Sequence, residues 1–542
     1  MTTLPPPPTI GADGTIETDV VIVGAGLAGL YAALELPDGT SVVVVDKGTP
    51  GNSGSSPWAQ GGMAVALGPD DSPALHLADT LRAGDGLCDP AAVHVLATEA
   101  PARVAHLLQL GTRFDRIPGR EDSLDPADLH LAREGGQTVS RSVHTADATG
   151  AEMVRVLRTA AAPRVARLPA AAIRLAGEPH GRVTGVWVTA ADGRLLLVRA
   201  RAVLLATGGC GGLFAATTNP DSATGDGVAL AHLAGAAVRD LEFVQFHPTG
   251  LAVGESWRFL LTEALRGAGA TLHAADGTRF MPALHPDAEL APRHVVAAAI
   301  LAQSGGGAFL DATGIPAEQL HEEFPTVMAG AAQHGFDLAT ERVPVTPAAH
   351  YMVGGIRTDL HGRTSLAGLF AAGEVASTGL HGANRMAGNS LAEALVFGRR
   401  AALAMTDVLD EPLGDAGPRP AFDDVDVDVA DLDGLRRRLR QAVWLGAGPV
   451  RSPDGLDQLG QELTDLAAAL GGPDGDAAVL RTAERVSHVP EVNELRRAVH
   501  VADLIRTSAR LRDETRGGHV REDLPNTNSA WQDVHVERIR PA

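Results

Sequence analysis

Apolar residues near the start of the chain follow two patterns. Continuous apolar runs of strand length lie within 18–23 (TDVVIV) and 41–45 (SVVVV), and the segment LAGLYAALEL at 27–36 between them has the length and composition of a helix. A short, continuous apolar run is typical of a strand that is buried on both faces of a parallel sheet. The order of strand, glycine-rich turn, helix and strand therefore predicts a compact βαβ unit.

The same kind of sequence returns further along the chain. A βα-rich region, including the apolar strand RAVLLATGG at 201–209, continues to about residue 230, and a strand-like GLFAAGEV follows at 368–375. The stretch between them has a mixed character. We therefore predict an α/β fold in which a Rossmann-like domain, formed by 18–230 and 346–408, is interrupted by an α+β capping domain at 231–345.

Both ends of the chain differ from this central part. Residues 1–17, which include a run of four prolines, are expected to form a disordered tail. The acidic, proline-containing stretch 409–430 is expected to be a linker. Helical patterns then predict a C-terminal helical bundle over 431–542.

The last long helical pattern carries one apolar face. That face is typical of a packed seam between helices. Its residues are Leu495, Val499, Ala502 and Ile505. The TRGGH turn that follows, with Arg516 and His519, is interpreted as a helix C-terminus that ends at glycine.

Length and charge limit the classes of function. The 542 residues exceed what one hydrophobic core usually covers, so we expect several domains. Lys and Arg number 45 against 66 Asp and Glu, and the net charge of −21 opposes binding to nucleic acid or to an anionic membrane. We also expect neither a signal peptide nor a membrane span, because no sufficiently long apolar run occurs. Two isolated cysteines, Cys88 and Cys210, predict no metal site and a cytoplasmic location.

The glycine-rich turn after the first strand carries candidate chemistry. Gly24, Gly26 and Gly29 form a GxGxxG turn, whose missing side chains let a pyrophosphate approach the helix N-terminus. Asp46 ends the next strand 22 residues after Gly24, where a carboxylate accepts hydrogen bonds from a ribose hydroxyl. This context favours a dinucleotide site over a purely structural turn. Lys47 is either a solvated surface lysine or a counter-charge for cofactor phosphate.

A second candidate is an isolated arginine in the segment LHGANRMAGNSLAEAL at 380–395. Arg385 has no other charge nearby in the sequence, and a guanidinium grips a carboxylate with two hydrogen bonds. Its ligand is either an external anion or a structural acid. Asn389 or Ser390 is placed to cap the apolar helix that follows, whose free N–H groups would then face a ligand.

Taken together, the ordered motifs resemble the succinate dehydrogenase and fumarate reductase flavoprotein family over nearly the whole chain. Within that family, the resemblance is greatest to the soluble members that oxidise an amino dicarboxylate. The motifs are VVIVGAGLAG, GSSPWAQGG, HLAREGGQTVSRSVHTADATG, LLATGG, TGDG, QFHPTG, FLLTEALRGAGA, DGTRFMP, ELAPRHVVAAAI, PAAHYMVGGIRTD and AGEVASTGLHGANRMAGNSLAEAL.

The resemblance implies FAD as the cofactor. Members that carry flavin covalently have a histidine five residues before the Gln of AQGG, and here Ser55 stands at that distance from Gln60, so FAD is expected to be noncovalent. The residues expected to bind it are Gly24, Ala25, Gly26, Leu27, Ala28, Gly29, Asp46, Lys47, Ser55, Ser56, Ala59, Gln60, Gly61, Gly62, Thr207, Gly208, Asp226, Glu374, Ser390 and Leu391.

The resemblance also implies the residues that bind a dicarboxylate. They are His247, Thr262, His350 and Arg385, which would compensate two buried carboxylates. Glu134 matches a glutamate suited to a substrate ammonium group, although it could instead pair with Arg133 or Arg141.

Arg293 matches an arginine that donates and accepts a proton in this family, although it could instead be a surface charge at the start of a helix. A guanidinium holds its proton tightly. Arginine could therefore act as a general base only with a chain of groups that passes the proton onward, or in a site that stabilises its neutral form.

The expected activity is oxidation of L-aspartate to iminoaspartate, with hydride transfer to flavin N5 and reoxidation by O2 or fumarate. The product would feed quinolinate synthase and so NAD biosynthesis. One alternative is a soluble fumarate reductase or related dicarboxylate dehydrogenase. A non-catalytic flavin-binding interaction protein is another, and the presence of Arg293, His350 and Arg385 weighs against it.

Overall fold

The computed structural model describes residues 9–48, 54–254, 257–303, 306–423, 431–473, 475 and 477–540. The proline run at 5–8 and residues 424–430 of the expected linker lie outside these ranges. The predicted tail reached too far, because the first strand already begins at Thr15, where Thr15–Thr18 pair with Leu197–Ala200. Within the described ranges, no helix has the length and apolar character needed to cross a membrane.

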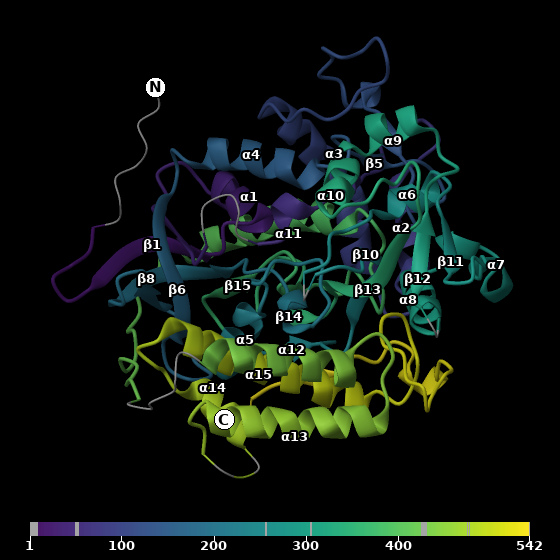
Figure 1. Ribbon diagram of the computed structural model, residues 1–542. Helices are drawn as coiled ribbons and strands as arrows, with labels where there is room; N and C mark the ends of the chain where they lie inside the picture. Colours follow the sequence, from purple (N-terminus) through teal and green to yellow (C-terminus); the bar gives the residue numbers. More distant parts are fainter. Residues whose placement is uncertain are drawn as a thin grey trace.

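A mainly parallel sheet forms the centre of the molecule (Figure 1). Its strands are β1 (Thr15–Val23), β2 (Val42–Asp46), β6 (Ala166–Ala176), β7 (Gly185–Ala190), β8 (Leu195–Leu205) and β15 (Leu369–Ala371). β2, β1, β8 and β15 run parallel in that order. β6 continues the sheet beyond β2, and then β7 joins β6 to β8 with antiparallel pairing, so the strands close into a ring.

Helices cover both faces of this sheet, and alternate residues of β1 point to each face. Val20 and Ile22 pack in a core with α1 (Leu27–Glu35), α3 (Pro90–Gln109), α4 (Thr149–Ala161) and α11 (Asn389–Met405). Val21 and Val23 pack in a second core with α5 (Asp226–Leu233) and the C-terminal helices. Figure 1 shows these two helical layers above and below the sheet. Burial on both faces explains why the strands are apolar throughout.

A separate antiparallel sheet with its own core lies beside the first. It consists of β10 (Val244–Leu251), β13 (Val343–Met352), β12 (Ala308–Asp311) and β11 (Thr271–Ala274), in that order. The helices around it are α6 (Glu263–Gly267), α7 (Met281–Leu284), α8 (Arg293–Leu301), α9 (Ala317–Glu323) and α10 (Pro325–Gln333). We call this unit the cap.

The ends of the cap sheet differ from the boundaries expected at 231 and 345. β9 (Val238–Arg239) pairs with β14 (Gly355–Arg357), outside the cap sheet, and β13 continues to Met352. The change in residue composition along the chain could not predict these boundaries, because they depend on strand pairings between distant segments. The domain division itself stays a prediction.

Shorter elements complete the fold. β3 (Met63–Ala64), β5 (Ser142–Val143) and β4 (Leu131–Ala132) form a small sheet, and α2 (Pro73–Ala83) packs on α3. β16 (Ala376–Ser377) and β17 (Glu537–Arg538) extend the pair formed by β14 and β9. The described start of the expected linker packs on the main sheet, where Thr184 Oγ1 donates to Asp415 O over 2.7 Å.

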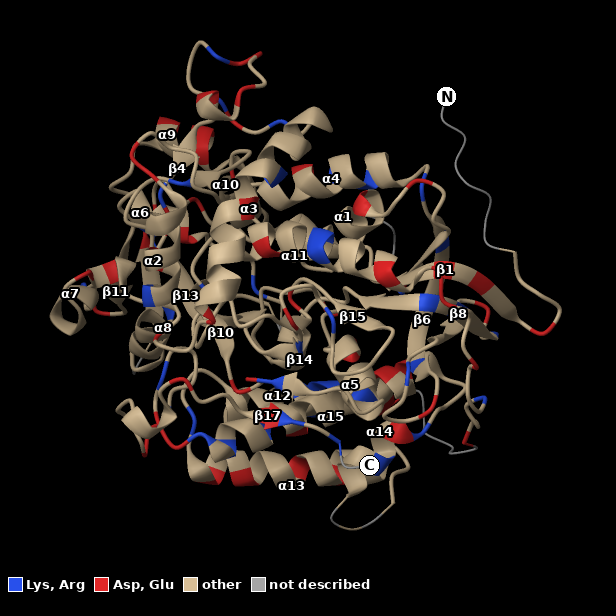
Figure 2. Cartoon of the chain, turned by 180° about the vertical axis from the view of Figure 1, so that it is seen from behind, with Lys and Arg blue, Asp and Glu red and all other residues tan. Residues whose placement is uncertain are grey.

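The C-terminal helices are α12 (Leu432–Ala447), α13 (Pro453–Ala469), α14 (Ala478–Glu484) and α15 (Pro490–Leu511). Figure 2 shows acidic positions spaced along α13, on the outer side of this layer. The seam predicted on α15 is confirmed, because Leu495, Val499, Ala502 and Ile505 are all buried.

In the predicted C-terminal helical domain over 431–542, the last described α-helix, α15, ends at Leu511. After α15 the chain runs back over the main body as an irregular segment that ends in β17. The interpretation of the TRGGH turn as the helix C-terminus was wrong, because α15 ends at Leu511 and the turn at 515–519 follows later. Instead, Gly518 N–H donates to Ala383 O over 2.9 Å, and Arg516 and His519 are buried. Glycine is required there because a Cβ on Gly517 would lie 2.3 Å from Ala383 O.

Candidate active site

A cavity of about 230 Å³ lies at the carboxyl ends of the parallel strands and extends to the cap. Val23 at the end of β1, Asp46 at the end of β2 and Ala206 after β8 all line it. This is the edge at which open α/β sheets bind their ligands, because the loops that follow the strands diverge there.

The GxGxxG turn forms one wall of the cavity. Gly24 has φ +109°, and a Cβ on it would lie 2.3 Å from Ala206 O, so only glycine fits the turn. Gly26 precedes α1, and its neighbours in the helix, Leu27 and Ala28, also line the cavity. The helix N-terminus thus faces the space with N–H groups that lack intrahelical partners.

Gly29 has a different role from the one expected. It is absent from the described lining of the cavity. A Cβ on Gly29 would lie 2.2 Å from Gly24 O and 3.1 Å from Ile22 Cγ2. The third glycine therefore allows α1 to pack closely on β1, and it does not contact the ligand space.

Lys47 also lines the cavity, but its ammonium group is paired. Lys47 Nζ lies 2.7 Å from Asp226 Oδ2 and 2.6 Å from Glu494 Oε2, and it donates to Thr224 Oγ1. Lys47 is an exposed residue, but its ammonium group is paired and not only solvated. Its charge is shared with two carboxylates beside the ligand space.

The start of α11 forms the opposite wall. Gly388, Ser390 and Leu391 line the cavity there. The predicted side-chain cap was wrong, because the residue before the helix is Gly388 in the left-handed conformation, with φ +82°. Asn389 points away, donating to Thr80 Oγ1 over 3.0 Å and contacting His76 Nε2. Without a side-chain cap, the first N–H groups of α11 are available to a ligand.

Glu374 is the carboxylate in this wall. Its Oε1 accepts a hydrogen bond of 2.9 Å from Met352 N–H. Burial raises the pKa of Glu374 to about 7. Thr207 and Gly208, from the second glycine-rich turn, line the cavity nearby.

All six residues expected at the substrate end line the same cavity. They come from six segments of the chain. These residues are Glu134, His247 on β10, Thr262 before α6, Arg293 at the start of α8, His350 on β13 and Arg385. The cap supplies four of them, so the site lies between the cap and the main body.

Arg293 is held by two partners in the cap. Its Nε and Nη2 lie 2.7 Å and 2.6 Å from Glu263 Oε2, and its Nη1 donates to Gln245 Oε1 over 2.9 Å. Burial opposes ionisation of Glu263, but Arg293 and Arg266 hold the pKa of this carboxyl below its ordinary value. The interpretation of Arg293 as a surface charge is wrong, because it is buried.

Arg385 is less fully paired. Its Nη2 lies 3.4 Å from His350 Nε2, its Nη1 donates to Met386 O over 3.4 Å, and its Cζ lies 4.9 Å from the centre of the Tyr351 ring. Within the described structure, nothing accepts a hydrogen bond from its buried Nε. Burial, together with the charge of Arg293, lowers the pKa of Arg385 to about 10. This guanidinium is suited to an anionic ligand.

Two histidines face each other between the arginines. The ring centres of His247 and His350 are 5.2 Å apart, and His350 Nδ1 is 2.8 Å from Thr218 Oγ1. Burial lowers the pKa of both imidazoles well below the ordinary value, and the charge of Arg293 lowers them further. Both rings are therefore neutral near pH 7 and can donate one hydrogen bond each.

Glu134 is the carboxylate that faces this group of cations. Its Oε1 accepts a hydrogen bond of 2.7 Å from Gly62 N–H, and burial raises its pKa. In the described part of the chain it makes no ion pair with Arg133 or Arg141, so that alternative was wrong. Arg133 donates to Gln137 O, and Arg141 pairs with Asp71 and Asp79.

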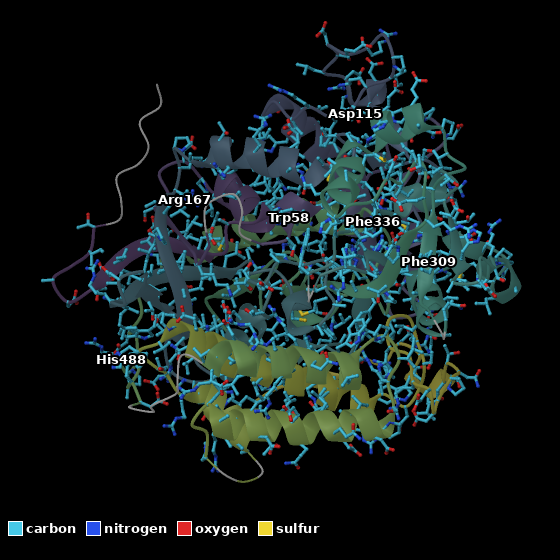
Figure 3. All side chains as sticks on the ribbon, viewed as in Figure 1. Trp58, Asp115, Arg167, Phe309, Phe336 and His488 are labelled. Atoms are coloured by element: carbon cyan, nitrogen blue, oxygen red, sulfur yellow. The ribbon has the colours of Figure 1, made fainter. Side chains whose placement is uncertain are left out.

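Several lining residues were missed from the sequence. Glu263 and Tyr351 lie in motifs that were recognised, TEALRG and AHYM, but nothing local assigned them a contact. Trp58 lines the cavity, and its ring centre lies 5.7 Å from that of Trp257. In the view of Figure 3, Trp58 lies over the region of α1 and α11, and it is 49% exposed. The feature of the sequence that could have indicated Trp58 is its position within the glycine-rich motif GSSPWAQGG.

The residues around the cavity fit FAD. Gly24, Gly26 and Gly208 leave the backbone open, and two helix N-termini face the space, which suits a pyrophosphate. Asp46, at the end of β2, suits a ribose hydroxyl.

Comparisons with known proteins agree with this geometry. A family model described as "FAD binding domain" matches residues 19–391, and one described as "Fumarate reductase flavoprotein C-term" matches 436–538. L-aspartate oxidase of Caulobacter vibrioides is 46% identical over 94% of this chain and 94% of its own length. L-aspartate oxidase of a Nostoc species is 41% identical over 96% and 93%.

Solved structures give the same answer for the fold. FrdA of E. coli quinol fumarate reductase, in a variant form, superposes with a TM-score of 0.84 and 29% identity, covering 97% of this chain and 95% of that one. Sdh1 of Mycobacterium smegmatis gives 0.80 and 30%, covering 96% and 92%.

The fold and the cavity define an FAD-dependent flavoprotein of the succinate dehydrogenase and fumarate reductase type. Within that class, the chain belongs to the L-aspartate oxidase family. FAD is its cofactor.

Proposed function

We propose that this chain oxidises L-aspartate to iminoaspartate with noncovalently bound FAD. The observation that carries the proposal is that Glu134, a partly buried carboxylate with a single backbone donor, lines one cavity together with two arginines and two histidines. Two anionic groups and one cationic group on the ligand would match this arrangement. L-aspartate has two carboxylates and one ammonium group.

The residues that would hold FAD line the deeper part of the cavity. The N-termini of α1 and α11 would meet the pyrophosphate and the flavin, and Asp46 would accept from a ribose hydroxyl. Ser55 has no ring nitrogen with which to attach flavin, so the binding is noncovalent. FAD, when bound, supplies the two-electron acceptor for the hydride of the substrate.

The substrate carboxylates would be met from the cap and from the main body. Arg385, with a free Nε, would take one carboxylate in a charged hydrogen bond, and the neutral His247 and His350 would donate to the same group of oxygens. Thr262 adds a hydroxyl donor at the cavity wall. Burying two carboxylates without such donors would be very costly.

The reaction removes one hydride and one proton from the substrate. The Cα–H bond breaks and its electron pair leaves with the hydrogen, while the nitrogen loses a proton and forms a double bond to Cα. Glu134 would hold the ammonium until that proton leaves. Enclosure between the cap and the main body excludes water, which protects the imine from hydrolysis.

Two partners in the cap fix the guanidinium of Arg293. Glu263 contacts its Nε and Nη2, and Gln245 accepts from its Nη1. We propose that Arg293 orients a substrate carboxylate with the N–H groups that these two partners leave unused.

Electrons would then leave to O2 or to fumarate. The iminoaspartate would be consumed by quinolinate synthase on the route to NAD, which we propose as the partner reaction. The free cysteines Cys88 and Cys210 are compatible with the cytoplasmic location that we propose.

One experiment tests this function. The purified yellow protein is mixed with L-aspartate without oxygen, and the flavin absorbance is recorded before and after addition of fumarate or O2. We expect bleaching by aspartate and recovery with either acceptor. Persistent colour in the presence of aspartate would contradict the proposal. Acid precipitation should leave a colourless pellet if FAD is noncovalent.

A soluble fumarate reductase is the second candidate, favoured by the 0.84 TM-score to FrdA of the E. coli enzyme. It predicts no bleaching by aspartate, together with oxidation of the reduced flavin by fumarate. A non-catalytic flavin-binding protein predicts neither change. It is separated from a fumarate reductase by first reducing the flavin chemically without oxygen and then adding fumarate, which should restore the colour only in the reductase.

A further inference from the structure

Through two charged side chains, helix α15 of the C-terminal layer contacts two residues that line the cofactor cavity. Arg497 Nε donates to Asp226 Oδ1 over 2.9 Å, and Glu494 Oε2 lies 2.6 Å from Lys47 Nζ. Lys47 Nζ is also 2.7 Å from Asp226 Oδ2. The four charges thus alternate in one chain: Glu494, Lys47, Asp226 and Arg497.

Only the two inner members of this chain face the ligand space. Lys47 and Asp226 line the cavity beside Asp46, which suits the ribose of the cofactor. Among the described lining residues, none comes after Ala394, so α15 supplies no wall of the cavity itself. Glu494 and Arg497 act one layer further out.

Asp226 is the member that most needs a partner. It is the first residue of α5, and its side chain is only 12% exposed. Burial opposes its ionisation, but Lys47 and Arg497 hold the pKa of Asp226 below its ordinary value. The carboxylate is therefore ionised at the edge of a cavity that must accept the two negative charges of a pyrophosphate.

We infer that Arg497 is a cofactor-positioning residue: its guanidinium neutralises and orients Asp226, so that the C-terminal layer takes part in holding FAD. Its side chain is 4% exposed, and its Nε contacts the Asp226 oxygen that Lys47 leaves free. Without Arg497, Asp226 would keep only Lys47, which also pairs with Glu494, while Arg436 Nη2 lies 3.8 Å from Glu494 Oε1 and helps to balance that carboxylate. The charge of this group would become one unit more negative beside an anionic cofactor.

The inference gives opposite expectations for the two α15 side chains. Arg497→Gln adds one uncompensated negative charge, so FAD should bind about ten-fold more weakly at low salt. Glu494→Gln removes a negative charge and leaves Lys47 freer to face phosphate, so FAD binding should be unchanged or tighter. A general loosening of α15 would instead weaken binding in both variants.

The test measures FAD release on dilution of the purified holoenzyme, followed by the rise in flavin fluorescence, at low and at high salt. Arg506→Gln is the matched control, because Arg506 lies on the same helix and pairs with Asp503, away from the cavity. Arg497→Lys should restore most of the affinity, and Arg497→Gln combined with Asp226→Asn should recover part of it.

Three outcomes would overturn the inference. They are parental FAD affinity in Arg497→Gln, an equal loss in Arg506→Gln, and a loss in Glu494→Gln as large as that in Arg497→Gln. If Arg497→Gln does not fold, the FAD affinities of Arg497→Lys and Glu494→Gln decide whether the inference holds. The inference rests on FAD being the cofactor, which the parent protein's own affinity tests separately.

Discussion

The guanidinium of Arg385 lies over the ring of Tyr351, with 4.9 Å between Arg385 Cζ and the ring centre. The Tyr351 hydroxyl in turn donates to Glu393 Oε2 over 2.8 Å, so the ring that supports the arginine is itself fixed. This stacking leaves the edge of the guanidinium directed into the cavity. A planar, delocalised cation suits both contacts, which a lysine would not reproduce.

Replacing Arg385 should abolish aspartate oxidation and leave FAD bound. Arg385→Leu removes the least-paired cation of the site, so kcat/KM for aspartate should fall by at least about 100-fold. Arg385→Lys should recover little of this activity, because lysine lacks the planar guanidinium that binds a carboxylate with two hydrogen bonds. Steady-state kinetics and the flavin spectrum of the purified variant check both expectations. Turnover near the parental level would remove Arg385 from the site.

Glu134 should control the choice between an amino dicarboxylate and a plain one. Glu134→Gln removes the charge that faces the ammonium, so KM for aspartate should rise by about 10- to 100-fold. Fumarate has no ammonium group, and its reduction by the chemically reduced protein should change much less. If the variant lost activity equally with aspartate and with fumarate, Glu134 would only stabilise the conformation of its loop and would not select the substrate.

The same residue predicts a pH dependence. Burial raises the pKa of Glu134, and protonation removes the charge that binds the ammonium. The value of kcat/KM for aspartate should therefore fall as pH decreases through an apparent pKa above that of an ordinary glutamate. In Glu134→Gln this acidic limb should be absent. The pH profile of both proteins, measured with saturating acceptor, tests the assignment.

Glu374 predicts a pH effect on stability. Its pKa is about 7 in the folded chain against an ordinary 4.5, so between these values the folded state keeps a proton that the unfolded chain releases. The free energy of unfolding should therefore fall as pH rises through this window, by about 3 kcal/mol. Denaturant titrations of the FAD-free chain should show this slope, and Glu374→Gln should reduce it. An unchanged slope would show that another group titrates.

Asp147 joins the main body to the cap. Its two carboxylate oxygens accept from Thr326 N–H over 3.0 Å and Val327 N–H over 2.7 Å, at the start of α10. Asp147→Ala should lower the free energy of unfolding by about 1 kcal/mol and also raise KM for aspartate, because the cap is held less firmly.

Asp89→Ala is the control for this prediction. Asp89 accepts from Ala91 N–H at the start of α3, so its replacement removes a cap within the main body. It should lower stability similarly and leave KM unchanged. If both variants change KM alike, the contact between Asp147 and α10 has no special effect on substrate binding.

Local patterns were sufficient for the elements whose cause is local. The apolar runs predicted β1 and β2, the GxGxxG turn predicted the first wall of the cavity, and helical spacing predicted the buried seam of α15. In each case the burial and the backbone conformation follow from a few consecutive residues. The ordered motifs also predicted which six residues line the substrate end of the cavity.

Contacts between distant segments settled the rest. Sequence spacing could not show that Gly388 and not Asn389 precedes α11, that Gly29 packs on β1, or that Glu263 holds Arg293. Nor could it show that α15 reaches Asp226, 271 residues away in the chain. Hydrogen bonds and ion pairs require groups to approach within a few ångströms, and only the packing of the cap and of the C-terminal layer on the main sheet brings these groups together.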